Sequence, residues 1–400
     1  GPPLFPFGRA RAASCVPPPA RAGADETGND HRADHPHHRE RRLTAVAPPP
    51  RAEAGPKGLR TGALGLWGNT VIGLGATAPA YSLAATLGYV VLAVGEKAPA
   101  MFLVAFVPML FVAVAYRELN RAVPDCGTTF TWGTKAFGPW VGWMGGWGVA
   151  VSAIIVLANV AEIAAVYTLR ALGFVAAAEN TLVKVGVGVL FILVMTWVSH
   201  RGIVLSERFQ NALIVFQIVV LAVLAAGALW LVYSGDAGPQ AVLPSWNWFD
   251  PTGISGSAAA QALILCIFVY WGWDACLAVG EETRGSTSTP GRAALLATVI
   301  LLAIYVVVAV ALQSYAGFGA TGIGLANPEH SEDVLTLLGA PMGGTVLTAV
   351  LLLTVAVSAA SSTHFTPSAN SSSARGSPLA STNDGKKRSE ALVTSSSISI

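Results

Sequence analysis

Residues 210–233 read QNALIVFQIVVLAVLAAGALWLVY, a run that contains no charged side chain. A helix of about 20 residues crosses the roughly 30 Å hydrocarbon layer of a bilayer, so the run is long enough to span it. Within lipid every backbone amide needs a partner inside the protein. A helix provides that partner, whereas barrel strands are about half as long and alternate in polarity. The run therefore predicts a membrane-spanning α-helix.

Similar apolar runs recur along most of the chain. Apolar side chains make up 53% of the 400 residues and charged side chains 12%, which excludes an ordinary soluble globular domain. The basic residues stand in the N-terminal tail and in short loops, so we expect no nucleic-acid partner. We predict an all-α integral membrane protein whose eight spans cover residues 63–89, 98–116, 140–169, 181–199, 210–233, 257–279, 293–315 and 343–363.

Two polar segments flank the apolar region. Residues 1–58 are rich in proline and arginine and have no apolar period, so we predict a disordered tail. Residues 364–400 contain eleven serines and read as a Ser-rich low-complexity tail. The change at Thr363 is abrupt, and we expect that the membrane domain, residues 59–363, is truncated there after its eighth span.

The chain has no motif that requires a metal or a cofactor. Its four cysteines are not spaced as a disulfide framework or a zinc site. Four histidines in the N-terminal tail stand among arginines and lack the fixed geometry of a metal site. These histidines are His31, His35, His37 and His38. We expect neither a metal nor a cofactor.

The lysines and arginines predict the orientation of the chain in the membrane. Arg51, Lys57 and Arg60 precede the first span, whereas the loops 234–256 and 316–342 contain neither lysine nor arginine. Cytoplasmic loops carry an excess of these residues. We therefore expect a multi-pass protein of the plasma membrane with a cytoplasmic N-terminus.

The first span contains Gly73, Leu74 and Gly75 near its middle, followed by Pro79. Proline has no amide hydrogen to bond the carbonyl four residues back, here that of Gly75, so we predict a break in the helix. A break presents amides on one half-helix and carbonyls on the other, which suit a carboxylate and a cation at mid-membrane depth. The alternative is that the glycines only allow close helix packing.

The sixth span repeats this theme in the residues Tyr270, Trp271, Gly272, Trp273 and Asp274. Interrupted helices in corresponding positions of two halves indicate one shared binding site. The two helices start five spans apart. Because five is an odd number, the second half of the chain would cross the membrane in the opposite direction to the first half, as in an inverted repeat. The aromatic residues are predicted to gate the site, with plain packing as the alternative.

Two acidic side chains, Glu162 and Asp274, lie well inside the predicted spans. An ionised group in lipid costs several kcal/mol, so both should face protein or a water-filled cavity. Each would carry a coupling proton or only bond a neighbouring helix. Asn159, one turn before Glu162, is the expected partner of that carboxylate, and Lys184 should extend toward the membrane surface.

The predicted cytoplasmic loop at 117–132 reads RELNRAVPDCGTTFTW and is followed by Phe-Gly-Pro at 137–139. This loop resembles the signature of the amino acid–polyamine–organocation permeases. Residues 73–75 resemble the glycine-rich break in the first helix of that family. Residues 268–274, together with Gly-Glu-Glu at 280–282, resemble its sixth helix and exit loop. The resemblance covers about residues 59–363.

The resemblance implies a LeuT-type inverted repeat with a known kind of site. Backbone amides near Gly73 and Gly75 would hold a substrate carboxylate, and carbonyls from Tyr270 to Gly272 would hold its amino group. The candidate substrate-binding residues are Gly73, Leu74, Gly75, Ala76, Tyr270, Trp271, Gly272 and Trp273. The candidate coupling or gating residues are Asp274, Glu162, Asn159 and Ser358.

Sodium and protons are both candidate coupling ions. Ser358, Ser361 and Ser362 in the eighth span would help to ligate sodium. Some relatives couple to protons through a lysine in the fifth span, and this chain has none there.

The leading hypothesis is a secondary active transporter for an amino acid or a related amine, working by alternating access and driven by a proton or another cation. The family has about twelve spans, and eight would leave the second repeat incomplete. The alternative is a transport-inactive fragment that acts as a binding or assembly module. An enzyme is not expected, because the spans contain no histidine and no cluster of acids.

Overall fold

The computed structural model describes residues 61–200, 203–329 and 331–362. These residues are mainly helical, which confirms the predicted all-α fold class. Among them, one short parallel pairing of extended backbone joins Leu64 to Thr283. Both predicted tails, at 1–58 and 364–400, and the four histidines at positions 31–38 lie outside the described residues.

The helices follow one another through the described part of the chain, with short 3₁₀ turns (η) between some of them. In order they are α1 (Leu66–Thr77), α2 (Pro79–Val94), η1 (Gly95–Lys97), α3 (Ala98–Ala122), α4 (Thr128–Phe137), α5 (Pro139–Ala171), α6 (Val175–Glu179), α7 (Thr181–His200), α8 (Ile203–Ser234), η2 (Trp246–Phe249), α9 (Gly256–Val269), α10 (Ala275–Ala278), η3 (Gly280–Glu282), α11 (Thr289–Ala316) and α12 (Val334–Ser362).

Six helical stretches in the described residues are long and apolar enough to cross a membrane. The first, Leu66–Ala122, includes α1, α2 and α3 in succession, and the sixth predicted span is not among the six because α9 is short. The last predicted span begins at a kink within α12, where Gly343 and Gly344 have non-helical backbone angles. The number of eight crossings therefore stays a prediction.

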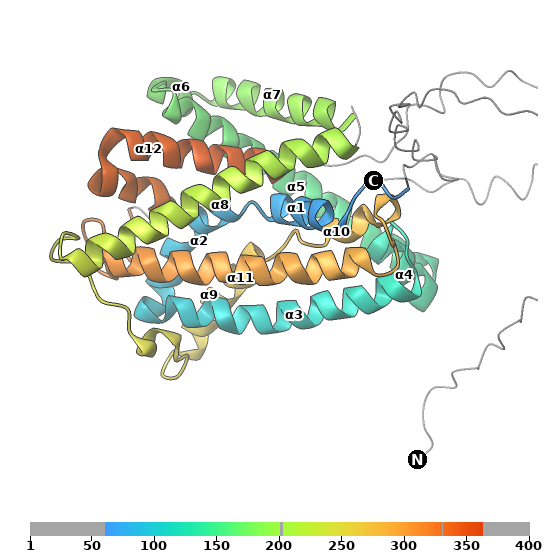
Figure 1. Ribbon diagram of the computed structural model, residues 1–400, viewed down its shortest axis with the longest axis horizontal. Coiled ribbons are helices and arrows are strands. Elements are labelled where there is room, and N and C mark those ends of the chain that lie inside the picture. The colour runs from blue at the N-terminus through green and yellow to red at the C-terminus, as the bar shows by residue number, and fades with distance from the viewer. Residues whose placement is uncertain (1–60, 201–202, 330, 363–400) are drawn as a thin grey trace, which may run out of the picture. The chain divides into compact units, whose positions relative to one another are not determined.

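Helix α11 packs against several neighbours and builds much of the core. It contacts α3, α8 and α1, and Figure 1 shows α3 running alongside it. Its buried face follows the spacing of three or four residues that one side of a helix requires. The residues of this face include Ala294, Ala297, Leu301, Tyr305, Val308 and Leu312. The alanines at the first positions allow neighbouring helices to approach closely.

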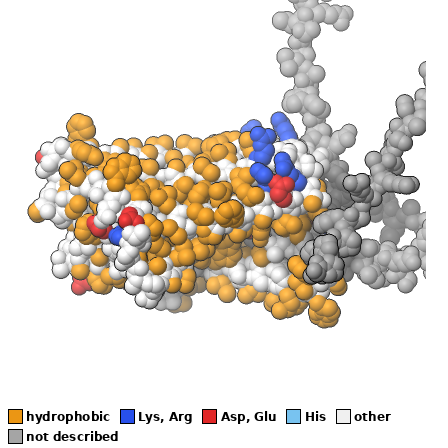
Figure 2. Space-filling model, turned by 90° about the horizontal axis from the view of Figure 1, so that it is seen from below, with side chains coloured by type: hydrophobic (Ala, Val, Ile, Leu, Met, Phe, Trp, Pro, Cys, Tyr) orange, Lys and Arg blue, Asp and Glu red, His pale blue; other side chains and the backbone are white. Residues whose placement is uncertain are grey.

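The surface supports a membrane environment. Figure 2 shows a face that is mostly hydrophobic along its middle, with lysine and arginine side chains gathered near one end. Large apolar side chains such as Phe111, Trp140, Leu182 and Trp230 are exposed. In water such a surface would drive aggregation, whereas lipid covers it at little cost.

Candidate functional site

The first predicted span is interrupted at Ala78. Helix α1 ends at Thr77, Ala78 adopts the left-handed angles φ 46° and ψ 63°, and Pro79 starts α2. The carbonyl oxygen of Gly75 accepts a hydrogen bond from the amide of Ala78 (3.2 Å) and another from Ser361 Oγ (3.2 Å). The break that the proline predicted is present, and the hydroxyl of α12 bonds the carbonyl next to it.

The sixth predicted span is interrupted between α9 and α10. Residues 270–274 form turns, and Gly272 has a φ of +119°, which favours glycine. A Cβ atom on Gly272 would lie 2.8 Å from the carbonyl carbon and oxygen of Ala76 and 2.9 Å from the amide nitrogen of Thr77. The two interruptions, predicted to share one site, therefore touch backbone to backbone.

Gly73 and Gly75 lie inside α1, before the break. A Cβ atom on Gly73 would lie 2.4 Å from Cys276 Sγ, so this glycine allows α10 to pack against α1. The amides that a break leaves unpaired belong to the first turn of the helix that follows it, here α2. The amide of Tyr81 in that turn donates to Ser358 Oγ at 3.1 Å. A substrate carboxylate on the amides of Gly73 and Gly75 stays a prediction.

The aromatic residues of the second interruption point in different directions. Tyr270 is fully buried, and its hydroxyl donates to the carbonyl oxygen of Phe102 at 3.2 Å. Trp273 is buried edge-on against Tyr116, with ring centroids 5.5 Å apart, whereas Trp271 is 40% exposed. Tyr270 and Trp273 thus pack into the bundle, and the backbone at Gly272 makes the contact with the first interruption.

Two of the predicted coupling residues, Asn159 and Ser358, each bond Tyr81 in the first turn of α2. The hydroxyl of Tyr81 donates to Asn159 Oδ1 on α5 at 3.0 Å, and the amide of Tyr81 binds Ser358 on α12. Ser361, on the same helix as Ser358, bonds Gly75. Helices α5 and α12 therefore both bond residues beside the break. Ser362 instead donates to the carbonyl oxygen of Ala359 in its own helix.

The acidic candidates lie apart from these bonds. Lys184 Nζ donates to Glu162 Oε1 at 3.0 Å, in a partly exposed ion pair between α5 and α7. The expected pairing of Glu162 with Asn159 is wrong, because Asn159 faces Tyr81 and Glu162 faces α7. Asp274 is partly buried and directly precedes α10.

Gln210 on α8 is a site residue that the sequence analysis missed. Its side chain is buried, and its Nε2 donates to the carbonyl oxygen of Ser361 at 3.1 Å. A Cβ atom on Gly75 would lie 2.0 Å from Gln210 Oε1. The sequence does contain a signal for it, a glutamine side chain at the start of an apolar run. Buried polar groups in membrane helices cost free energy and usually have a role.

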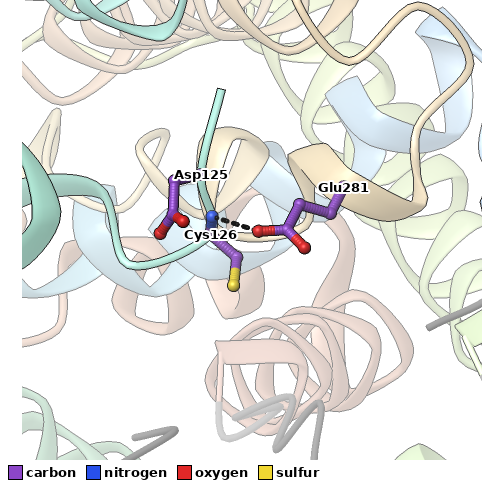
Figure 3. A group of neighbouring side chains, drawn as sticks. All are labelled: Asp125, Cys126 and Glu281. Carbon is purple, nitrogen blue, oxygen red and sulfur yellow. Dashed lines mark hydrogen bonds between the residues drawn. The ribbon is translucent and has the colours of Figure 1, made fainter. Parts of the chain in front are cut away.

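A second cluster joins the loop before α4 to η3 (Figure 3). Ligand-type atoms of Asp125, Cys126 and Glu281 lie within 4.8 Å of one another, an arrangement able to hold a metal ion. Asp125 Oδ1 accepts from the amide of Gly127 and from Thr131 Oγ1, each at 2.8 Å. Glu281 Oε1 accepts from the amide of Cys126 at 3.1 Å. Each carboxylate therefore already holds the loop in place, and the expected absence of a metal stays a prediction.

Curated relatives of the chain are membrane transporters. The low-affinity putrescine importer PlaP of Escherichia coli (strain K12) is 28% identical over 53% of this chain and 45% of its own length. The branched-chain amino acid permease BcaP of Lactococcus lactis subsp. cremoris (strain MG1363) is 25% identical over 56% of this chain and 51% of its own. The chain spans about half the length of these relatives.

The family described as amino acid permease matches residues 63–366, which include both interruptions and the loop that contains Asp125. The match covers more than half of the chain. The family and its named relatives are transporters and not enzymes. This chain therefore belongs to the amino acid permease family and is a multi-pass membrane protein.

Proposed function

We propose that this chain binds an amino acid or a related amine and moves it across the plasma membrane by alternating access. The observation that carries the proposal is the contact between the two interrupted helices, where Gly272 meets the backbone of Ala76 and Thr77. A contact of this kind lets a movement of either half-helix change the other. Membership of the permease family supports the same conclusion.

Helix dipoles suit the ends of α1 and α2 to a substrate with an ammonium group. The carboxyl end of α1 carries partial negative charge, and the amino end of α2 carries partial positive charge. An ammonium group would lie near the carboxyl end of α1, and a carboxylate near the first turn of α2. The relatives are named for putrescine and for branched-chain amino acids, which share the ammonium group.

Coupling to a proton or to sodium is part of the proposal. The side chains that bond residues beside the first break include Asn159, Ser358 and Ser361, and Gln210 bonds the carbonyl oxygen of Ser361; all four are uncharged. Their oxygen atoms offer ligands to a hard cation such as sodium. The N-terminus would be cytoplasmic, as the distribution of basic residues predicts.

A transport-inactive module that binds a partner is the alternative. One observation favours it: α5 exposes a row of large apolar side chains. The row includes Trp140, Trp143, Trp147, Ile154 and Ile155. Either lipid or the helices of another membrane protein would cover this face.

The test is uptake of radiolabelled amino acids and diamines into proteoliposomes, with imposed proton or sodium gradients. We expect uptake of at least one compound that rises with a gradient. The matched pair of variants is Gly75→Leu, which fills the space of Gln210, and Gly148→Leu, whose position has open space around it. Binding of a compound without uptake by folded protein would support the alternative.

A further inference from the structure

We propose that Gln210 is the positioning residue of the first interrupted helix, and that its amide controls how readily the break at Ala78 moves during transport. The inference rests on the proposed function and adds a residue to it. Helix α8, which carries Gln210, contacts α1 and α12, and Figure 1 shows it passing across this part of the bundle.

A short chain of hydrogen bonds joins the three helices. Gln210 is 3% exposed, and its Nε2 donates to the carbonyl oxygen of Ser361 on α12 at 3.1 Å. The single hydroxyl proton of Ser361 is shared between two acceptors, the carbonyl oxygen of Ser358 at 2.7 Å and the carbonyl oxygen of Gly75 at 3.2 Å. The side-chain amide of Gln210 therefore bonds Ser361, and Ser361 in turn bonds the carboxyl end of α1 at Gly75.

The same amide also interlocks with α1 by shape. A Cβ atom on Gly75 would lie 2.0 Å from Gln210 Oε1 and 2.9 Å from its Cδ, so the glutamine occupies the space of a side chain at position 75. This contact gives Gly75 a role that differs from binding a substrate carboxylate. Glycine at this position lets α8 insert an amide beside the break.

The oxygen atom of the amide, Gln210 Oε1, is buried and makes no hydrogen bond to the described residues. A buried acceptor without a donor costs free energy, more so in an apolar bundle than near water. A second arrangement of the break that supplies a donor to this oxygen would therefore compete with the observed one. Gln210 is in this way suited to hold α1 firmly enough to order it and weakly enough to release it.

The first experiment uses Gln210→Glu, which keeps the shape and the Oε1 atom but replaces the donor. An ionised carboxylate would face the carbonyl oxygen of Ser361 and repel it, whereas the protonated acid restores a donor. We expect uptake by the variant, divided by wild-type uptake at the same pH, to rise at least fivefold between pH 7.5 and 5.5. The concentration for half-maximal uptake should stay within about threefold of wild type, because the residue acts on the movement and not on the substrate.

The second experiment tests the interlock without relying on transport. Gly75→Ala should lower the unfolding temperature of the purified protein, and adding Gln210→Ala should recover part of the loss because the smaller side chain makes room. Gly148→Ala, with no atom near its new Cβ, is the matched control. If Gly75→Ala lowers the unfolding temperature by the same amount in the wild-type protein and in the Gln210→Ala variant, the interlock is overturned.

The two proposals fail in different ways. Absence of uptake by folded wild-type protein counts against the proposed function. In that case the role of Gln210 is tested by the unfolding temperature of Gln210→Glu, which should rise relative to wild type as the pH falls and the acid regains a donor. A wild type that transports, together with a Gln210→Glu variant whose relative uptake is the same at both pH values, would overturn the positioning role alone.

Discussion

At the scale of single residues, two backbone positions make the interruptions possible. Ala78 has left-handed angles, which cost a residue with a Cβ atom about 1–2 kcal/mol. Gly272 combines a positive φ with close approach to Ala76, and only glycine fits both conditions. Local strain of this kind is found at functional sites when the surrounding structure enforces it. Here Pro79 on one side and the contact with Gly272 on the other enforce it.

Gly272→Ala should therefore abolish most uptake and lower the unfolding temperature, because its Cβ would overlap the Ala76 carbonyl. Gly173→Ala is the matched control, since Gly173 also has a positive φ (82°) but has open space around it. Uptake assays and thermal unfolding of the two variants separate the contact from the backbone angle. Similar behaviour of both variants would show that the contact with α1 is unimportant.

At the scale of elements, α12 begins with a partly buried acidic cap, Asp333. The amide of Thr336 donates to Asp333 Oδ1 at 3.3 Å, in the usual pattern of an N-cap. Burial raises the pKa of the Asp333 carboxyl above its ordinary value, although hydrogen bonds from Thr336 oppose the shift. The folded state thus binds this proton more tightly than the unfolded state does. Binding of this proton therefore stabilises the folded state at pH values below the unfolded pKa of about 4. This stabilisation is lost as the pH rises through the higher pKa of the folded state.

Asp333→Asn keeps a capping oxygen and removes the charge. The unfolding temperature of the variant minus that of wild type should therefore increase as the pH is raised from about 4 toward 7. Asp250→Asn is a control of opposite sign, because hydrogen bonds from Thr252 lower the pKa of Asp250. A difference for Asp333→Asn that stays flat with pH would contradict the raised pKa.

At the scale of the whole molecule, contacts between segments far apart in sequence connect the two interrupted helices. The amide of Leu64, just before α1, donates to the carbonyl oxygen of Glu282, and the amide of Arg284 donates back to Leu64. Asn69 Nδ2 also donates to Thr283 Oγ1 at 2.9 Å. These bonds tie the start of α1 to the segment after α10, on the side where the basic residues predict the cytoplasm.

The predicted orientation can be checked by thiol labelling. Cysteines introduced at Ser245 and at Lys135 occupy exposed positions in the loop before α9 and in α4. In intact cells, with Cys15 and Cys126 replaced by serine, a membrane-impermeant reagent should label Ser245→Cys and leave Lys135→Cys unlabelled until the cells are opened. The reverse pattern would place the N-terminus outside.

The apolar helices, the two interruptions and the family could be predicted from the amino-acid sequence, because each depends on a local property: the length of an apolar run, a proline without an amide hydrogen, or a contiguous motif. The hydrogen-bond and packing partners of the site residues could not be predicted in this way. Asn159 bonds Tyr81, Glu162 pairs with Lys184, and Gln210 interlocks with Gly75. The spacing of these residues along the chain does not predict which of them form pairs. The faces of α5, α8 and α12 that contact α1 and α2 depend on how all the helices pack together.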